Sequence, residues 1–175
     1  MTSIINTATQ AAHAAAASLV AKAQIKPGDA IPSTQNLLKE DAADKPLASL
    51  SLTGKNVIVG VPGAFTGTCN KQVPGYIEKY EAFKAKGINE IFVVAVNDLF
   101  TMKAWKENLA PNGTPVRFLV DDTGAWVTSL GLLFDATPLL GAPLTEGDKV
   151  DFIAVEQVPS DIQVTGAETI LAQLS

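Results

Sequence analysis

Two apolar runs of strand length, separated by a helical repeat, dominate the hydrophobic pattern of the chain. The runs cover residues 56–61 and 91–96, and both are continuous and rich in β-branched side chains. Runs of this kind are typical of strands that are buried on both faces of a sheet. Between them, apolar residues recur at helical spacing up to a natural stop at Gly87: Val73, Tyr76, Ile77, Tyr80 and Phe83. The pattern predicts a strand–helix–strand unit with a right-handed crossover and parallel strands.

Further elements continue the alternation of strand and helix. We expect a helix over residues 99–109, capped by Asn97 or Asp98, and a third parallel strand over residues 116–120. The Asp121–Asp122 pair is interpreted as the cap of a short helix rather than as a metal site or an acid–base pair. Together these elements predict an α/β fold, in which a central mixed sheet carries helices on both faces.

The C-terminal part of the pattern is less regular. Residues 151–158 are predicted to form an antiparallel strand, and Thr165 with Glu168 forms a capping-box pattern that opens a final helix. Residues 146–149 resemble a hairpin turn, so a strand is expected to precede them. Residues 139–145 contain proline and no run of β-branched residues, so either this segment pairs weakly or a strand is absent. We expect one edge strand to be missing, and a short edge strand to form over residues 47–52.

The first residues differ in composition from the rest of the 175-residue chain. Residues 1–28 contain no Asp or Glu, and alanine dominates residues 8–21. We therefore predict an alanine-rich extension over residues 1–24 and one domain over residues 25–175. An acid-free start is typical of mitochondrial transit peptides, but these are usually rich in arginine and this segment has none. We expect a cytoplasmic protein, with mitochondrial import as the alternative.

Charge and residue counts narrow the classes of function. The net charge of −5 and the pI near 4.8 argue against a nucleic-acid partner, because phosphates are bound by clustered Lys and Arg. No apolar run approaches the ~20 residues of a membrane span. The one cysteine, Cys69, cannot form an internal disulfide, and the one histidine, His13, lies far from it in the sequence, so no Cys–His pair is indicated. Four large aromatic residues are interpreted as core or interface residues: Phe100, Trp105, Trp126 and Phe134.

Cys69 is the candidate for chemistry because it follows the first strand and a turn, at the predicted start of a helix. The unpaired N–H groups of a first helical turn carry partial positive charge, which favours a thiolate over a thiol. A thiolate is a nucleophile. The alternative is an inert buried thiol, because free cysteine is among the most buried residue types.

The segment Pro62-Gly-Ala-Phe-Thr66-Gly-Thr-Cys69 closely resembles the active-site loop Pro-x-x-x-Thr-x-x-Cys of the peroxiredoxins. The chain is similar to the type II, peroxiredoxin-5-like members of that family over about 150 residues, which is more specific than a lone motif. The similarity continues in five segments: residues 72–78, 94–98, 102–105, 118–122 and 167–171. The resemblance implies a thioredoxin-like fold and reduction of hydroperoxides by a cysteine that becomes a sulfenic acid.

The resemblance also implies roles for individual residues. Cys69 would be the peroxidatic nucleophile, the Thr66 hydroxyl would donate to the thiolate or the peroxide, and Pro62 would shield the thiolate from water. The backbone N–H groups of Thr68 and Cys69 would face the peroxide as an oxyanion hole does. No cofactor and no metal is implied.

Two features depart from the family pattern. Gly67 stands where the family usually has proline, which loosens the turn. The active-site arginine that the family carries on a later strand is absent, and Arg117, the one arginine of the chain, is not at that place. Loss of one donor to developing charge costs on the order of 10²-fold in rate.

We therefore expect a thiol peroxidase that acts on hydrogen peroxide and alkyl hydroperoxides and has no internal resolving cysteine. Its reductant would be glutathione with glutaredoxin, or thioredoxin, and the family implies a homodimer. One alternative is a catalytically impaired variant that acts as a redox sensor or binding protein. A thioredoxin-like oxidoreductase or glutathione-linked transferase is the other, weakened by the lack of a Cys-x-x-Cys pair.

Overall fold

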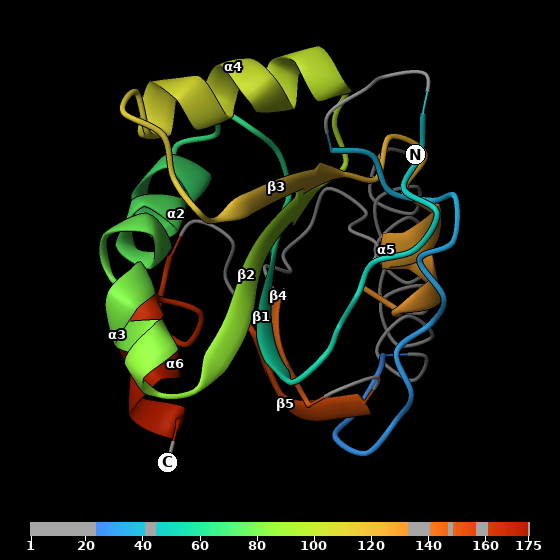
Figure 1. The fold of residues 1–175 in the computed structure, drawn as a ribbon, viewed down its shortest axis with the longest axis vertical. Coiled ribbons are helices and arrows are strands. Elements are labelled where there is room, and N and C mark those ends of the chain that lie inside the picture. Colours follow the sequence, from blue (N-terminus) through green and yellow to red (C-terminus); the bar gives the residue numbers. More distant parts are fainter. Residues whose placement is uncertain (1–23, 41–44, 133–140, 147–148, 157–160, 175) are drawn as a thin grey trace, which may run out of the picture.

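A five-stranded mixed sheet forms the centre of the protein (Figure 1). The structure is a computed structural model that describes residues 24–40, 45–132, 141–146, 149–156 and 161–174. The strand order is β3-β2-β1-β4-β5, with β3, β2 and β1 parallel and both β4 and β5 antiparallel to their neighbours. The strands are β1 (Lys55–Val61), β2 (Ile88–Ala95), β3 (Arg117–Val120), β4 (Gly141–Glu146) and β5 (Lys149–Val155). The predicted extension over residues 1–24 lies, except for Gln24, outside the described residues.

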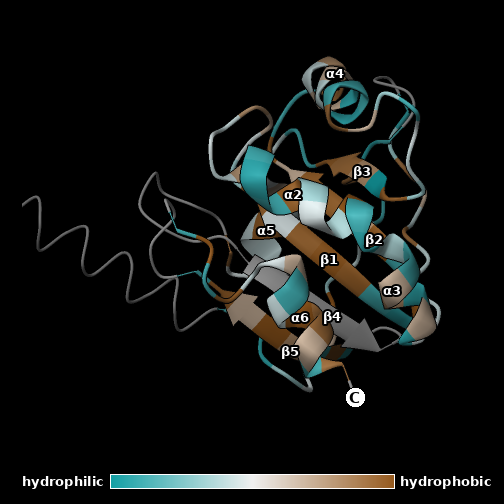
Figure 2. Ribbon diagram, turned by 90° about the vertical axis from the view of Figure 1, so that its left-hand side faces the viewer, coloured by the Kyte–Doolittle hydropathy of each residue, from teal (hydrophilic) through white to brown (hydrophobic). Residues whose placement is uncertain are grey.

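Helices cover both faces of the sheet and divide the core into two clusters. The helices are α2 (Cys69–Glu78), α3 (Tyr80–Ala85), α4 (Leu99–Leu109), α5 (Ala125–Ser129) and α6 (Ala167–Gln173). Alternate residues of β2 point to opposite faces, so Val93 packs with α2, α3, α4 and α6, whereas Phe92 packs with α5 and the segment before β1. In Figure 2 the hydrophobic colour follows β1 and β3, while hydrophilic residues lie on the outer turns of the helices. Among the described residues, no helix has the length and apolar character needed to cross a membrane.

The predicted strand–helix–strand unit is confirmed. β1 and β2 pair in parallel from Asn56 opposite Glu90 to Val61 opposite Ala95. The helix between them is divided at Lys79 into α2 and α3, and Gly87 ends it with a φ of +82°, which glycine adopts without a steric penalty. The third parallel strand is confirmed as β3.

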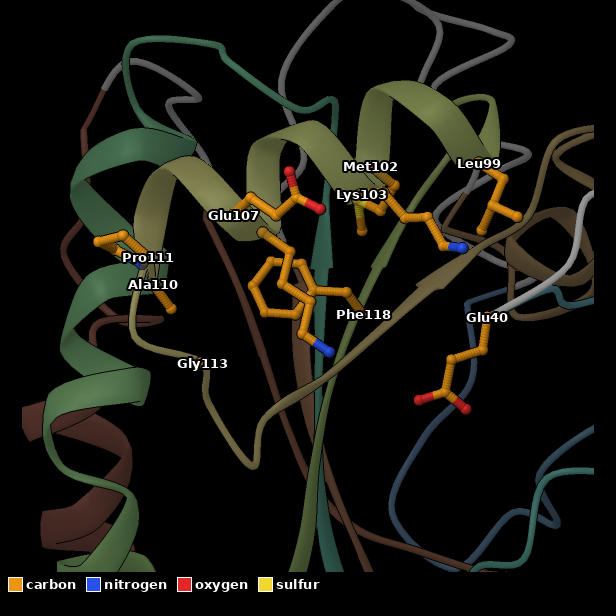
Figure 3. Close-up of a pocket in the computed structure, with 10 residues that line it drawn as sticks. Glu40, Leu99, Met102, Lys103, Glu107, Ala110, Pro111, Gly113 and Phe118 are labelled. Carbon is orange, nitrogen blue, oxygen red and sulfur yellow. The ribbon is translucent and has the colours of Figure 1, made fainter.

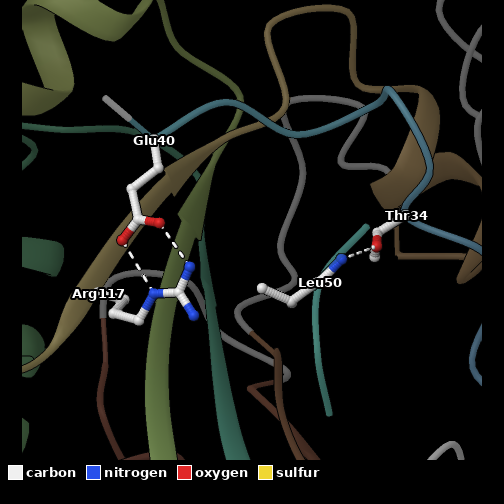
Figure 4. Close-up of polar contacts among 4 residues, drawn as sticks. All are labelled: Thr34, Glu40, Leu50 and Arg117. Atoms are coloured by element: carbon white, nitrogen blue, oxygen red, sulfur yellow. Dashed lines mark hydrogen bonds and ion pairs between the residues drawn. The ribbon is translucent and has the colours of Figure 1, made fainter. Parts of the chain in front are cut away.

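The predicted edge strand over residues 47–52 is wrong. These residues form an irregular segment whose backbone bonds go to the neighbouring loop rather than to the sheet. The Leu47 N–H donates to the Leu38 carbonyl at 2.7 Å, and the Leu50 N–H donates to the Thr34 hydroxyl at 2.7 Å (Figure 4). The alternating pattern here reflects burial of Leu50 in the α5-side core, not a ladder.

The expectation of a missing edge strand is also wrong. β4 is present, and it lies inside the sheet between β1 and β5. Val57 stands opposite Leu144 and Gly60 opposite Gly141, but the two strands do not pair at the two positions between them, where Pro143 falls. Proline cannot donate to a ladder, yet the register carries through because pairing depends on the remaining backbone groups and not on β-branched side chains. The hairpin is confirmed by the Glu146–Lys149 pair, with its turn outside the described residues.

Of the three predicted helix caps, that of α4 is confirmed, and that of α5 is confirmed only in part because its aspartate bonds to the helix from outside the cap position. Asp98 accepts from the Thr101 N–H at 2.9 Å and caps α4. Asp121 accepts from the Val127 N–H at 2.8 Å in the first turn of α5, although the residue directly before that helix is Gly124. Both aspartates therefore satisfy N–H groups that a helix leaves unpaired.

The third predicted cap, the capping box of the last helix, is wrong. Gly166 precedes α6 and supplies no side chain. The Thr165 hydroxyl instead donates to Glu156 at 2.8 Å, and Glu168 forms an ion pair with Lys79 at 2.9 Å. Tertiary partners have replaced the local bonds that the sequence pattern predicted.

Candidate active site

Cys69 is the first residue of α2, directly after the loop that follows β1. Its placement at a helix start confirms the prediction made from the pattern. The cysteine is free and 0% exposed, and it packs in the core between the sheet and α2. A nucleophile here lies beneath the surface of the protein.

Backbone donors gather around the start of α2. The Asn70 N–H donates to the Thr66 carbonyl at 2.9 Å, and the Gln72 N–H to the Thr68 carbonyl at 3.0 Å. Within the described part of the chain, no acceptor is found for the N–H groups of Thr68 or Cys69. The first turn also lacks an acidic side chain. Two unpaired donors and the positive end of the helix therefore lie beside the thiol.

The loop between β1 and α2 reaches the surface and returns. Pro62 is half-buried, whereas Phe65, Thr66 and Gly67 are exposed. Phe65 adopts a φ of +60°, in the left-handed region that few side chains occupy. No hydrogen bond joins the exposed Thr66 hydroxyl to the Cys69 sulfur in this structure.

Two asparagine side chains hold this loop. Asn97, after β2, accepts from the Ala64 N–H at 2.8 Å. Asn70 lies at 3.5 Å from the Phe65 carbonyl through its Nδ2, and its Oδ1 accepts from the Trp105 indole of α4 at 2.5 Å. Sequence reasoning missed Asn70, because a polar residue in a first helical turn has no pattern that names a distant partner.

The four large aromatic residues identified in the sequence differ in burial and in position. Trp105 and Trp126 are both in the core, at 0% and 1% exposure, as predicted. The Trp126 indole donates to the Pro32 carbonyl at 3.1 Å on the other face of the sheet. Phe100 is 74% exposed and is not a core residue, and Phe134 lies outside the described residues.

A buried polar network lies under α2, one turn beyond Cys69. Gln72 donates from Nε2 to the Thr165 hydroxyl at 2.8 Å, and the Tyr76 hydroxyl donates to the Thr165 carbonyl at 2.6 Å. Glu156 accepts from the Thr165 hydroxyl at 2.8 Å and from the backbone N–H groups of residues 163–165. Burial, and secondarily the negative charge of Glu156, raises the pKa of Tyr76 well above its ordinary value. The neutral phenol therefore remains a donor, and the network ties α2 to the C-terminal loop.

Arg117 is engaged away from the thiol. Its Nε donates to Glu40 at 2.9 Å and a second guanidinium nitrogen donates to the same carboxylate at 2.5 Å (Figure 4). The guanidinium lies over the Phe92 ring at 5.0 Å. Phe92 packs on the α5 side of the sheet, whereas Cys69 packs on the α2 side. Arg117 therefore does not take the place of an active-site arginine.

A pocket of about 400 Å³ opens between α4 and β3 (Figure 3). Its walls include Leu99, Met102 and Phe118, and charged side chains from Lys106 and Glu107 stand around them. The Lys106 ammonium lies 5.8 Å from the Phe118 ring centre. Cys69 does not line this pocket, so the pocket is separate from the thiol. The described residues contain no group of three or more potential metal ligands.

Comparisons with known proteins agree on one family. Residues 26–171 match the family model described as Redoxin. The chain is 42% identical over 129 residues to the peroxisomal membrane associated protein 20 of Schizosaccharomyces pombe, covering 69% of this chain and 83% of that protein. It is 41% identical over 137 residues to the mitochondrial peroxiredoxin-2F of Arabidopsis thaliana, covering 74% and 68%. Reduced Prx3 of Vibrio vulnificus, solved in complex with hydrogen peroxide, superposes with a TM-score of 0.74 at 33% identity, covering 86% of this chain and 100% of that one.

Proposed function

Because this chain belongs to the peroxiredoxin family and has its thioredoxin-like fold, we propose that Cys69 is the nucleophile of a thiol-dependent peroxidase. One observation supports Cys69 as the nucleophile. Cys69, the only cysteine, stands at the start of α2 beside two backbone N–H groups without an acceptor among the described residues.

In the proposed reaction the Cys69 thiolate attacks one oxygen of a hydroperoxide. A sulfur–oxygen bond forms as the oxygen–oxygen bond breaks, and the second oxygen leaves as an alkoxide or hydroxide that takes up a proton. Sulfur loses two electrons and becomes a sulfenic acid, while the peroxide is reduced to an alcohol or water. The N–H groups of Thr68 and Cys69 would stabilise the charge that develops on oxygen.

Thr66 and Pro62 are proposed as the remaining site residues. Thr66 lies in the same loop as the thiol, and its exposed hydroxyl is available to donate to an incoming peroxide. Pro62 is half-buried where β1 ends, and a rigid residue there would limit the movement of the loop and the access of water. Both roles are supported by position in the loop rather than by a contact with sulfur.

The sulfenic acid must be reduced by thiols from outside the chain, since no second cysteine is present. A first thiol would displace water to give a mixed disulfide with Cys69. A second thiol would then restore the Cys69 thiol and leave as part of a disulfide. Glutathione with glutaredoxin, or thioredoxin, would supply these thiols.

A second copy of the chain is the proposed protein partner. Of four large exposed hydrophobic residues among those described, three lie beyond the carboxyl ends of β1 and β2: Phe65, Val96 and Phe100. The bond from Ala64 to Asn97 ties the two segments that carry Phe65 and Val96. An apolar surface beside the site loop is typical of an interface between protein chains.

A catalytically impaired redox sensor is the second candidate function. It is favoured by one observation: the single arginine is bound to Glu40 on the far face of the sheet, so no guanidinium from the described residues serves the thiol. A sensor would form the sulfenic acid slowly and would not turn over. A peroxidase and a sensor thus differ in the rate at which Cys69 is oxidised and in whether the oxidised thiol is reduced for repeated turnover.

Intact-mass measurement after addition of hydrogen peroxide or an alkyl hydroperoxide distinguishes these functions. The peroxidase gains the mass of one oxygen at Cys69 rapidly, and glutathione with glutaredoxin, or thioredoxin, removes that oxygen and sustains turnover. The variant Cys69→Ser is the control and gains none. Slow oxidation without turnover supports the sensor, and oxidation of methionine in place of Cys69 contradicts both.

The compartment is proposed separately from the chemistry. The relatives reported above are peroxisomal and mitochondrial by their names, so cytoplasm stays a prediction and mitochondrial import its alternative. Fluorescence microscopy of the whole chain, with and without residues 1–24, decides between them. Mitochondrial signal that is lost with residues 1–24 would overturn the cytoplasmic assignment.

A further inference from the structure

The thiol of Cys69 is buried while the loop before it is exposed. Cys69 is 0% exposed, and Phe65, Thr66 and Gly67 lie at the surface. A thiol reagent must approach the sulfur in line with the bond that it breaks, and larger reagents need more room than a peroxide. The first turn of α2 or the loop before it must therefore move before a bulky thiol reaches Cys69.

One side chain joins this turn to a fixed part of the core. Asn70, the neighbour of Cys69, accepts from the Trp105 indole at 2.5 Å and directs its Nδ2 toward the Phe65 carbonyl at 3.5 Å. Its own N–H donates to the Thr66 carbonyl at 2.9 Å. Asn70 therefore contacts both the loop before Cys69 and the helix α4.

Trp105 is suited to anchor this contact. Its side chain is 0% exposed and packs edge-to-face on Phe118 of β3, with ring centres 5.8 Å apart. Asn70 is the one acceptor found for its indole N–H among the described residues. If Asn70 moved away with the first turn, a buried donor would lose its partner, which disfavours opening.

We propose that Asn70 is a positioning residue, which holds the first turn of α2 closed over Cys69 through the Trp105 indole and limits the access of thiols and thiol reagents to the sulfur. This inference rests on the proposed function, because access of thiols to Cys69 affects turnover only if Cys69 is the nucleophile of a peroxidase. The contact itself concerns the reduced protein and is measurable without turnover.

The rate at which iodoacetamide alkylates the reduced Cys69 measures opening directly, because the chain has one cysteine. The variants Asn70→Ala and Trp105→Phe each remove one end of the bond. We expect each to alkylate about fivefold faster than the natural chain, the factor that corresponds to one net hydrogen bond. The double variant is expected to be no faster than either single variant, because both remove the same interaction.

Trp126→Phe is the matched control, since it makes the same substitution in an indole that bonds to Pro32 on the other face of the sheet. We expect it to leave the alkylation rate unchanged. A rate for Asn70→Ala equal to that of the natural chain overturns the proposal. A similar acceleration in Trp126→Phe also overturns it, because general loosening would then explain the effect.

The second measurement follows the oxidised protein. After one equivalent of peroxide, the sulfenic acid in Asn70→Ala is expected to react with glutathione about fivefold faster than in the natural chain. Emission from Trp105, the only indole left in Trp126→Phe, is expected to change as Cys69 is oxidised and reduced. If the natural chain takes up no oxygen at Cys69, the proposed function fails, while the alkylation rates still decide the role of Asn70.

Discussion

At the residue scale, the hydroxyl of Thr66 is the group whose role is open to the simplest test. The side chain is exposed and makes no hydrogen bond to the Cys69 sulfur, so its removal leaves the packing of the fold intact. Its proposed partner is the peroxide, which would arrive from the exposed side of the loop. Thr66 therefore separates a catalytic contribution from a structural one.

Thr66→Val is expected to slow oxidation of Cys69 by about 10²-fold, the usual cost of one lost donor to developing charge. Stopped-flow measurement of oxidation by hydrogen peroxide gives this rate. Thr123→Val, at an exposed threonine before α5, is the control and is expected to keep the natural rate. Equal rates for the two variants would remove Thr66 from the site.

At the element scale, α2 is held at two places along its length. Asn70 ties its first turn to α4, and Gln72 with Tyr76 ties the following turn to the C-terminal loop through Thr165. The second attachment is buried and contains the Glu156 carboxylate. The position of the thiol thus depends on partners far away in the sequence.

The dependence of the free energy of unfolding on pH above pH 8 tests this second attachment. The folded protein holds the Tyr76 phenol neutral by burial, so the pKa of Tyr76 lies above the value of about 10 that an exposed tyrosine has. Tyr76 contributes stability fully below pH 10, and that contribution is lost as the pH rises from there, because the unfolded chain ionises first. In Tyr76→Phe the free energy of unfolding is expected to fall less between pH 8 and pH 11 than it does in the natural chain. Unfolding in urea across this pH range measures the difference.

Tyr80→Phe is the comparison for this prediction. The pKa of Tyr80 in the natural chain is also raised, by burial and by the charges of Glu90 and Glu81, but the Tyr80 side chain is only partly buried. We expect it to change the alkaline slope less than Tyr76→Phe does. A larger effect of Tyr80→Phe would mean that the buried network does not control the alkaline limb.

At the scale of the whole molecule, the exposed hydrophobic residues beside the site loop raise the question of assembly. Phe100 is the most exposed of them and stands at the first turn of α4. Burial of a phenylalanine side chain is worth about 1.5–3 kcal/mol, so one such residue affects the stability of an interface.

Phe100→Lys is expected to shift the proposed dimer toward monomer in sedimentation velocity, because a charge would have to be buried in the interface. Val164→Lys, at an exposed hydrophobic residue outside this surface, is the control and is expected to leave the dimer intact. A natural chain that sediments as a monomer at every concentration contradicts the homodimer.

The sequence by itself determined the parts of this protein that depend on local patterns. The continuous runs predicted β1 and β2, and the helical repeat placed Cys69 at the start of α2. Either Asn97 or Asp98 is predicted to cap α4, and Asp98 is the residue that does so. The motif from Pro62 to Cys69 indicated the family, which the comparisons confirm. These features follow from the spacing of side chains along a short stretch of chain, so they can be predicted without knowledge of tertiary contacts.

Only the tertiary structure decided the features that depend on distant backbone. β4 forms although its sequence lacks a strand pattern, because β1 and β5 supply the ladder on either side, and the Thr165 hydroxyl turns to Glu156 instead of capping α6. Residues 47–52 alternate like a strand but bond to a loop. The contact of Asn70 with Trp105 joins residues 35 positions apart. No local pattern encodes such a pairing, because the partner is chosen by how the helices pack on the sheet.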